Sequence, residues 1–236
     1  MARIARIVAA GIPHHITQRG NRRQKTFFCD DDYRAYLELL AQWCSQYGVQ
    51  VWVYYLMPNH VHLIAAPESE QGLAAAIGEA HRRYTRLINF REDWRGHLWQ
   101  GRFASFVMDE RYLLAATRYV EMNPVRAGLV EKPEEYPWSS ASAHREGRND
   151  MLVKVSPLLE MVGDWQKFLS QEVAEKETEA LKLHERTGRP LGSENFVIGL
   201  EKKLGRRLRP GKPGPKPKAN SIKSPIRVMP PKLSPD

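Results

Sequence analysis

Two histidines separated by a single apolar residue stand in the strand-like segment HVHLIAA. Side chains at positions i and i+2 of a strand point to the same face, so His60 and His62 can converge on one ion while Val61 packs on the other side. An ion held by so few protein ligands keeps open positions for water or substrate. Alone, the pair is weak evidence, because two half-buried histidines without a metal give the same pattern.

Further along the chain, a tyrosine and an asparagine lie four residues apart at the end of a predicted helix. If the helix continues that far, Tyr119 and Asn123 share one face. A tyrosine hydroxyl can attack phosphorus and form a covalent phosphotyrosine, and the side-chain oxygen of Asn123 can act as a third metal ligand. A plain core aromatic is the alternative for Tyr119. Tyr112 lies on nearly the same face and ranks second, because only Ala116 stands four residues after it.

The hydrophobic pattern predicts the elements that must bring these residues together. Strands are expected over 6–18, 49–56, 61–66 and 97–107, and helices from Asp30 to Gly48, over 71–90 and over 109–122. Met57-Pro58-Asn59 is expected to form the tight connection between the second and third strands. The order β-α-β-β-α-β-α favours an α+β fold of the ferredoxin-like or RNA-recognition type, an antiparallel sheet with helices packed on one face. Later helices are expected over 156–162, 164–186 and 193–205.

Composition places the chain among folded proteins, with 42% hydrophobic residues and six tryptophans in 236 residues. No apolar run approaches the roughly 20 residues that cross a bilayer, so we expect no membrane partner. Pro13 interrupts the short apolar stretch at the N-terminus before a secretory signal is complete. The two cysteines are expected to remain thiols. Together these features predict a cytoplasmic, nucleoid-associated protein.

Positive charge is concentrated at the C-terminal end. The net charge is +9, and residues 201–236 hold 11 Lys and Arg against two acidic residues. A Pro-rich basic stretch cannot bury a core, and it attracts polyanions by releasing their counterions. We therefore predict a chemistry-bearing domain over 1–130, an accessory and mostly helical region over 131–205, and a disordered basic tail over 206–236.

Several clusters of side chains have the composition of nucleic-acid contacts. Loops and helix faces rich in arginine suit backbone phosphates, and an aromatic ring beside an amide and a guanidinium suits unpaired bases. A solvated loop, a solvent-facing helix and a core tryptophan are the alternatives. The candidates are Arg19, Arg22, Arg23, Lys25, Arg82, Arg83, Trp99, Gln100, Arg102, Arg126 and Arg189.

Strings along most of the chain resemble one known family. They are GIPHHITQRGNRRQKTFF, YYLMPNHVHLI, GHLWQGRF, RYVEMNPVRAGLV, YPWSSASAH and TGRPLG. The match as a whole spans roughly residues 5–205. In this order and spacing they resemble the REP-associated tyrosine transposases, relatives of the single-tyrosine HUH transposases of insertion sequences. The long basic tail is less typical of that family.

The resemblance implies an HUH endonuclease fold for residues 1–130 and a role for each matched residue. His60 and His62 would be the metal ligands, Tyr119 the nucleophile and Asn123 the metal-assisting residue. The implied cofactor is Mg²⁺ or Mn²⁺. The implied substrate is single-stranded DNA with REP-like hairpins, cleaved and rejoined through a 5′-phosphotyrosine with release of a 3′-OH.

Two other functions stay open on the sequence alone. A hairpin DNA- or RNA-binding protein could keep the sheet without cleavage, and a metal-dependent phosphodiesterase could use water as its nucleophile. The sequence also leaves open whether the protein is a monomer or a homodimer that exchanges tyrosine helices.

Overall fold

Four antiparallel strands in the order β2-β3-β1-β4 form the centre of the computed structural model, which describes residues 5–209. The strands are β1 (His14–Arg19), β2 (Val49–Met57), β3 (His60–Pro67) and β4 (Ala104–Val107). Every neighbouring pair is antiparallel. With a helix after β1 and another after β3, this is the β-α-β-β-α-β arrangement of ferredoxin-like folds, so the predicted α+β class and element order are confirmed.

The helices follow the predicted positions closely in the first half of the chain. They are α1 (Asp30–Gln46), α2 (Gly72–Arg91), α3 (Glu110–Glu121), α4 (Asn123–Arg126), α5 (Ala141–Glu146), α6 (Ser156–Val162), α7 (Trp165–Leu169), α8 (Glu175–Thr187) and α9 (Glu194–Leu204), with short 3-10 turns at Asn21–Arg23 and Pro133–Glu135. Three predictions differ in extent. The strand expected over 6–18 forms only over His14–Arg19, after Gly11 and Pro13. The strand expected over 97–107 is regular only from residue 104, and the helix expected over 164–186 is divided into α7 and α8.

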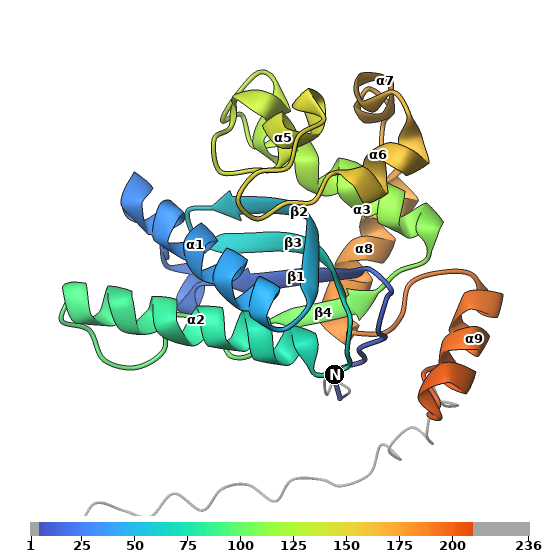
Figure 1. Ribbon diagram of the computed structural model, residues 1–236, viewed down its shortest axis with the longest axis horizontal. Helices are drawn as coiled ribbons and strands as arrows, with labels where there is room; N and C mark the ends of the chain where they lie inside the picture. The colour runs from blue at the N-terminus through green and yellow to red at the C-terminus, as the bar shows by residue number, and fades with distance from the viewer. Residues whose placement is uncertain (1–4, 210–236) are drawn as a thin grey trace, which may run out of the picture.

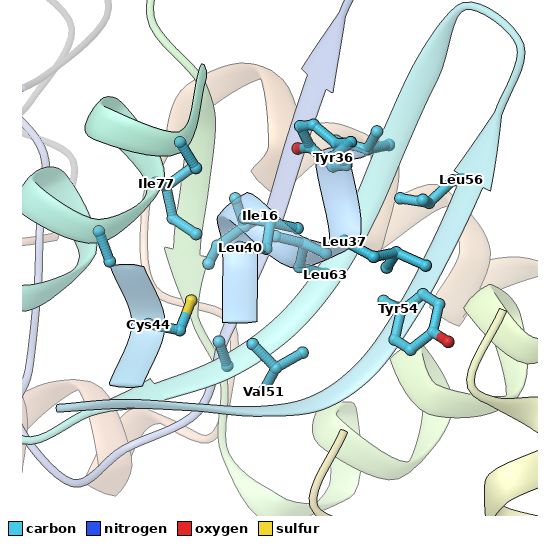
Figure 2. Close-up of a cluster of buried hydrophobic side chains, with 14 of the residues drawn as sticks. Ile16, Tyr36, Leu37, Leu40, Cys44, Val51, Tyr54, Leu56, Leu63 and Ile77 are labelled. Carbon is cyan, nitrogen blue, oxygen red and sulfur yellow. The ribbon is translucent and has the colours of Figure 1, made fainter. Parts of the chain in front are cut away.

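One face of the sheet carries α1 and α2, which pack against each other and against β2 (Figure 1). The side chains between them form a closed apolar layer, in which Tyr36, Leu40 and Leu63 are fully buried (Figure 2). Burial of apolar surface on this scale is the main force that holds a helix pair on a sheet. It fixes the frame on which the other face is built.

The opposite face of the sheet carries a second helical layer, made by α3 and α8 (Figure 1). The sequence predicted helices on one face only, so this second layer extends that prediction. Its physical reason is the alternation of β2 and β3, where Val53, Tyr55 and Ile64 point to this side and are fully buried with residues of α3 and α8. Residues beyond 130 thus share a core with the sheet; the predicted division into domains stays a prediction.

The start of α3 is fixed from the far end of the chain. Asp109 caps the helix by accepting a hydrogen bond from the Tyr112 N–H at 3.1 Å, and it also accepts one from the Ser193 N–H at 2.8 Å. Gly192 permits this approach, because a Cβ there would lie 2.8 Å from Oδ2 of Asp109. The TGRPLG string therefore anchors the first turn of α3.

The exposed edge of β2 is covered by the YPWSSASAH string. Leu56 N–H donates to the Trp138 carbonyl, and Ser140 N–H donates to the Tyr54 carbonyl. The Tyr136 hydroxyl adds a bond to the Leu56 carbonyl at 2.8 Å. Pairing and covering an edge strand in this way protects it from association with other strands.

The composition led to two expectations, one about membrane-spanning helices and one about a basic tail. Within residues 5–209, no helix is both long and apolar enough to cross a membrane. The basic tail predicted over 206–236 lies outside the described residues from position 210 onward.

A buried histidine at the start of β1 makes the stability of the fold sensitive to acid. Nε2 of His14 accepts a hydrogen bond from the Ala9 N–H, and Nδ1 donates to the Ile12 carbonyl. Burial lowers the pKa of His14 to about 4, so the folded protein resists a proton that the unfolded chain accepts near pH 6.5. The contribution of His14 to the free energy of unfolding is therefore fully present above pH 6.5 and is lost as the pH falls toward 4.

We expect His14→Gln to weaken this dependence. The wild-type free energy of unfolding should fall by about 2 kcal/mol for this group between pH 7 and pH 5, and the variant should lose less. Urea denaturation at several pH values measures the difference, with the exposed His97→Gln as control. An equal slope in wild type and His14→Gln would contradict the assignment.

Candidate active site

The β2–β3 hairpin sets the direction of both site histidines. Its connection is as short as predicted, and the register pairs Met57 with His60 and Tyr55 with His62. His60 and His62 therefore share the face of the sheet that carries α3, with ring centroids 5.2 Å apart. Val61 is fully buried on the opposite side. The strand alternation predicted from HVH is confirmed.

Hydrogen bonds to Nδ1 hold both site imidazoles in place. Nδ1 of His60 lies 2.7 Å from Oδ1 of Asn59, and Nδ1 of His62 lies 3.1 Å from Nε2 of His15. A proton on Nδ1 of His60, donated to Oδ1 of Asn59, leaves the lone pair on Nε2, as in metal-binding histidines held by an outer partner. The contact between His15 and His62 fits either tautomer, and His62 presents the same lone pair when its Nδ1 is the donor. Burial lowers the pKa of His60 to about 4 and lowers the pKa of His62 well below its ordinary value, so both rings are neutral at physiological pH.

Tyr119 lies directly beside these rings. Its ring centroid is 6.2 Å from that of His62, in an edge-to-face arrangement, and the side chain is half-buried on α3. Burial raises the pKa of the Tyr119 phenol, while the positive charges of Arg126 and Arg19 act in the opposite direction. Tyr112, the second choice, packs instead with the Arg111 guanidinium 5.6 Å above its ring.

Arg126 connects Tyr119 to Asn123. Its guanidinium lies 4.4 Å from the centre of the Tyr119 ring and donates to the Tyr119 carbonyl. The same group donates to Oδ1 of Asn123 at 2.6 Å. The helix does not continue to Asn123 as the prediction required: α3 ends at Glu121, and Asn123 begins the separate helix α4. Arg126 is the contact that joins the two residues. The carboxamide oxygen is engaged by Arg126, and its role toward a metal stays a prediction.

Three residues near the site were not singled out from the sequence. His15 stacks on His62 at 5.3 Å, and Thr17, paired with His62 in register, donates to Oε1 of Glu185 at 3.0 Å. Glu185 comes from α8, and its negative charge raises the pKa of the Tyr119 phenol. No local signal marks these contacts, because Thr17 and Glu185 are 168 positions apart.

A groove of about 280 Å³ opens beside His60 at the end of the sheet. It receives three of the predicted nucleic-acid residues, Arg19, Gln100 and Arg102, together with Glu185 and Arg186 of α8. The Gln100 N–H donates to the Arg19 carbonyl, so the loop that follows α2 extends the sheet along this groove. Arg22, Arg23 and Lys25 are exposed on the turn and loop just after β1.

Four other residues that were predicted to contact DNA have side chains that contact other parts of the protein. Arg82 and Arg83 both bind Glu79 on the surface of α2. Trp99 is 6% exposed and packs near His81 at 4.8 Å. Arg189 donates to the Leu208 carbonyl. Their contacts with DNA stay predictions.

The end of α3 is held by a buried polar cluster. Oε1 of Glu121 accepts from the Ser140 hydroxyl at 2.7 Å and lies 3.0 Å from Nδ1 of His144. The His144 ring stacks on Trp165 of α7 at 4.3 Å. Glu121 is two residues from Tyr119, so this cluster fixes the last turn of the tyrosine helix against β2 and α5. Ser140 and His144 lie in the YPWSSASAH string, but no function was predicted for either residue.

Comparison with known proteins agrees with this geometry. Residues 9–123, from β1 to the end of α3, match the family described as Transposase IS200 like. Over these residues the chain is similar to the IS200-like transposases.

Individual relatives point to one branch of such proteins. A protein of Haemophilus influenzae described as a REP-associated tyrosine transposase is 27% identical over 131 residues, which are 50% of this chain and 73% of the relative. The solved structure of a REP-associated tyrosine transposase bound to a REP hairpin covers 64% of this chain and 90% of its own, with TM-score 0.54 and 19% identity. A transposase structure from Deinococcus radiodurans matches with TM-score 0.36, at 19% identity over 51% of this chain and 96% of its own. The resemblance found in the sequence is confirmed, and the fold is shared.

The buried cluster at the end of α3 predicts a large loss of stability in Glu121→Ala. The substitution removes the acceptor that the Ser140 hydroxyl and the His144 imidazole share and leaves them the longer contacts with the Tyr54 and Ser140 carbonyls, at 3.3 and 3.1 Å, which costs about 2 kcal/mol. Urea denaturation measures the change in unfolding free energy. The control is Glu177→Ala, which removes an ion pair with the exposed Arg111 and should cost under about 1 kcal/mol. Equal losses in the two variants would contradict the assignment.

Proposed function

We propose that this protein is a metal-dependent tyrosine DNA transesterase that cleaves and rejoins single strands beside REP-like hairpins through a 5′-phosphotyrosine. The observation that carries the proposal is the convergence of His60, His62 and Tyr119 at one end of the sheet, with ring centroids 5.2 and 6.2 Å apart. The match of residues 9–123 to a transposase family supports this proposal. The site residues supply a nucleophile and candidate metal ligands for the reaction.

The donor set fits Mg²⁺ or Mn²⁺. Two neutral imidazoles would supply Nε2 atoms from one strand. Asn123 would supply its amide oxygen, which accepts one hydrogen bond from Arg126 and keeps a second lone pair. Within residues 5–209, no three His, Cys, Asp or Glu side chains form a metal cluster, so the carboxamide is the natural third ligand. Nitrogen and oxygen donors with open positions suit these ions. When bound, the ion would polarise the scissile phosphate and neutralise its developing charge.

The chain's own residues would carry out the remaining steps of the reaction. The Tyr119 oxygen attacks the phosphorus, its bond to phosphorus forms and the bond from phosphorus to the 3′ oxygen breaks. The phenol loses a proton and the leaving oxygen gains one, so the strand ends in a 3′-OH. A free tyrosine has a pKa near 10 and is a poor nucleophile at neutral pH. Arg126 and Arg19 favour the phenolate and oppose the effect of burial on its pKa.

The proposed partner is single-stranded DNA that carries a hairpin. The related structure with a REP hairpin bound suggests this class of substrate. Arg19 lines the groove beside His60, and the exposed Arg22, Arg23 and Lys25 lie on the turn and loop just after it. These cationic side chains can bind the phosphates of the DNA. The phosphotyrosine link conserves the energy of the cleaved phosphodiester bond. A 3′-OH can therefore attack the link without ATP, which either reverses the reaction or joins another strand.

A covalent adduct is the direct test of this function. We incubate the protein with Mg²⁺ or Mn²⁺ and a hairpin oligonucleotide labelled at both ends, and then look for a protein–DNA band on a denaturing gel. The wild type should form the band through its 5′ phosphate. Tyr119→Phe should abolish it, because no oxygen remains to attack, whereas Tyr112→Phe should retain it.

The other outcomes identify the alternatives. Binding without any product, in the presence of either ion, would favour a non-catalytic hairpin-binding protein. Cleavage that persists in Tyr119→Phe without an adduct in the wild type would favour water as the nucleophile. Either result would overturn the proposal.

A further inference from the structure

The helix α8 contributes to the wall of the groove beside His60. Its residues Glu185 and Arg186 line the groove together with residues of β1 and of the loop before β4. Both lie beyond residues 9–123, the part of the chain that matches the transposase family, so the family likeness gives them no role. Arg186 was also not among the residues that the sequence predicted to contact DNA.

Contacts along its length hold α8 in place against α3 and β4 (Figure 1). Leu181 is buried in the core that these elements share. Glu177 pairs with Arg111 of α3 at 3.1 Å. Just after the helix, the Leu191 N–H donates to the Val107 carbonyl of β4 at 2.9 Å. The helix is therefore a fixed wall of the groove, and the directions of its side chains are set by the fold.

Glu185 and Arg186 point to different sides of this wall. Oε1 of Glu185 accepts a hydrogen bond from the Thr17 hydroxyl at 3.0 Å, and Glu185 is partly buried against β1. Consecutive residues of an α-helix point about 100° apart. When Glu185 is directed at Thr17, Arg186 is therefore turned toward the open side of the groove, which agrees with its exposed side chain.

The guanidinium of Arg186 is not occupied by another protein group. Within residues 5–209 it forms no hydrogen bond and no ion pair, whereas Arg82 and Arg83 on α2 both bind Glu79. A guanidinium carries five N–H donors in a planar fork that matches the oxygens of a phosphate. Arg186 therefore presents a complete set of donors to whatever enters the groove.

Positive charge exceeds negative charge along the groove. Among the described residues, the charged side chains of its lining are Arg19, Arg102 and Arg186 against Glu185 alone. His60 is neutral, because burial lowers its pKa to about 4. The carbonyl end of α8 adds roughly half a negative charge, which is less than the excess of the arginines. The groove therefore favours an anionic ligand, and the phosphates of a DNA strand fit it.

We propose that Arg186 binds a backbone phosphate of the single DNA strand that lies in the groove beside His60. The inference rests on the proposed function and adds a DNA-binding residue to it. Because the groove adjoins His60, a candidate metal ligand, the bound phosphate lies close to the cleaved bond. Arg19 on β1 and Arg186 on α8 then hold the strand from two different elements of the fold.

Uncharged linkages in the DNA test this contact directly. The probes are one DNA hairpin with a single-stranded flank, made as a series in which one phosphate at a time is replaced by a neutral methylphosphonate. Fluorescence anisotropy gives the Kd of each probe for the full chain. The protein carries Tyr119→Phe, which prevents cleavage during the measurement, and is compared with the same protein that also carries Arg186→Gln.

We expect a neutral linkage at one position close to the cleavage site to weaken binding roughly tenfold when Arg186 is present, the effect of one lost charge-assisted hydrogen bond. The same linkage should have little effect in Arg186→Gln, because the contact is already absent. At the other positions the two proteins should respond alike. Arg186→Lys should retain part of the dependence, since lysine keeps the charge and loses the planar fork.

The matched control is Lys182→Gln. It removes a positive charge from an exposed position of the same helix that does not line the groove. This variant should leave the effect of every neutral linkage unchanged. A loss of long-range attraction would weaken the binding of all probes alike in both variants, whereas a direct contact couples Arg186 to one position only.

Two results would overturn the inference. The same pattern of linkage effects with and without Arg186 would show that its guanidinium binds no phosphate. Coupling to phosphates of the hairpin stem alone would place Arg186 away from the cleaved strand. The adduct assay separates this inference from the proposed function. Coupling without an adduct in the wild type would refute cleavage alone, and an adduct without coupling would refute the role of Arg186 alone.

Discussion

The structure depends on the packing of α3 against the face of the sheet that carries His60 and His62. A strand presents alternate residues to one side, so the hairpin register leaves no freedom in where the two imidazoles point. A shift of one residue would turn both into the α1–α2 core and expose Val61. The phenol can act beside them only if α3 is held at a fixed height and rotation over β2 and β3.

Contacts at both ends of α3 meet this requirement. Asp109 and Gly192 fix its first turn, and Glu121, Ser140 and His144 fix its last turn. These contacts come from segments beyond residue 130, which explains why the chain needs more than the sheet and its first two helices. The result is a rigid support for a site whose residues lie on regular elements, as precise geometry requires. Arg126 then connects the end of the helix to Asn123.

The sequence was sufficient for the parts of the site that depend on local periodicity. The HVH alternation predicted the direction of the histidines. The i, i+4 argument for Tyr119 and Asn123 required one continuous helix, whereas α3 ends at Glu121 and Asn123 belongs to α4. Contacts between distant segments could not be predicted, because nothing near Thr17 or Glu121 indicates Glu185 or His144 as its partner. The pairing of Arg82 and Arg83 with Glu79 could have been found, since the spacing of three and four residues places them together on a helix. The strand expected from residue 97 begins later because the backbone at Gly96 and Gly101 has positive φ.

The most direct test of the central claim is the environment of a bound Mn²⁺ ion. Pulsed electron paramagnetic resonance counts the imidazole nitrogens coupled to the ion, and a fluorotyrosine placed at residue 119 reports the distance of the ring through line broadening. The account predicts two coupled nitrogens that fall to one in His60→Ala, together with strong broadening of the fluorine signal. Manganese without nitrogen coupling, or two coupled nitrogens with an unbroadened signal from residue 119, would contradict it.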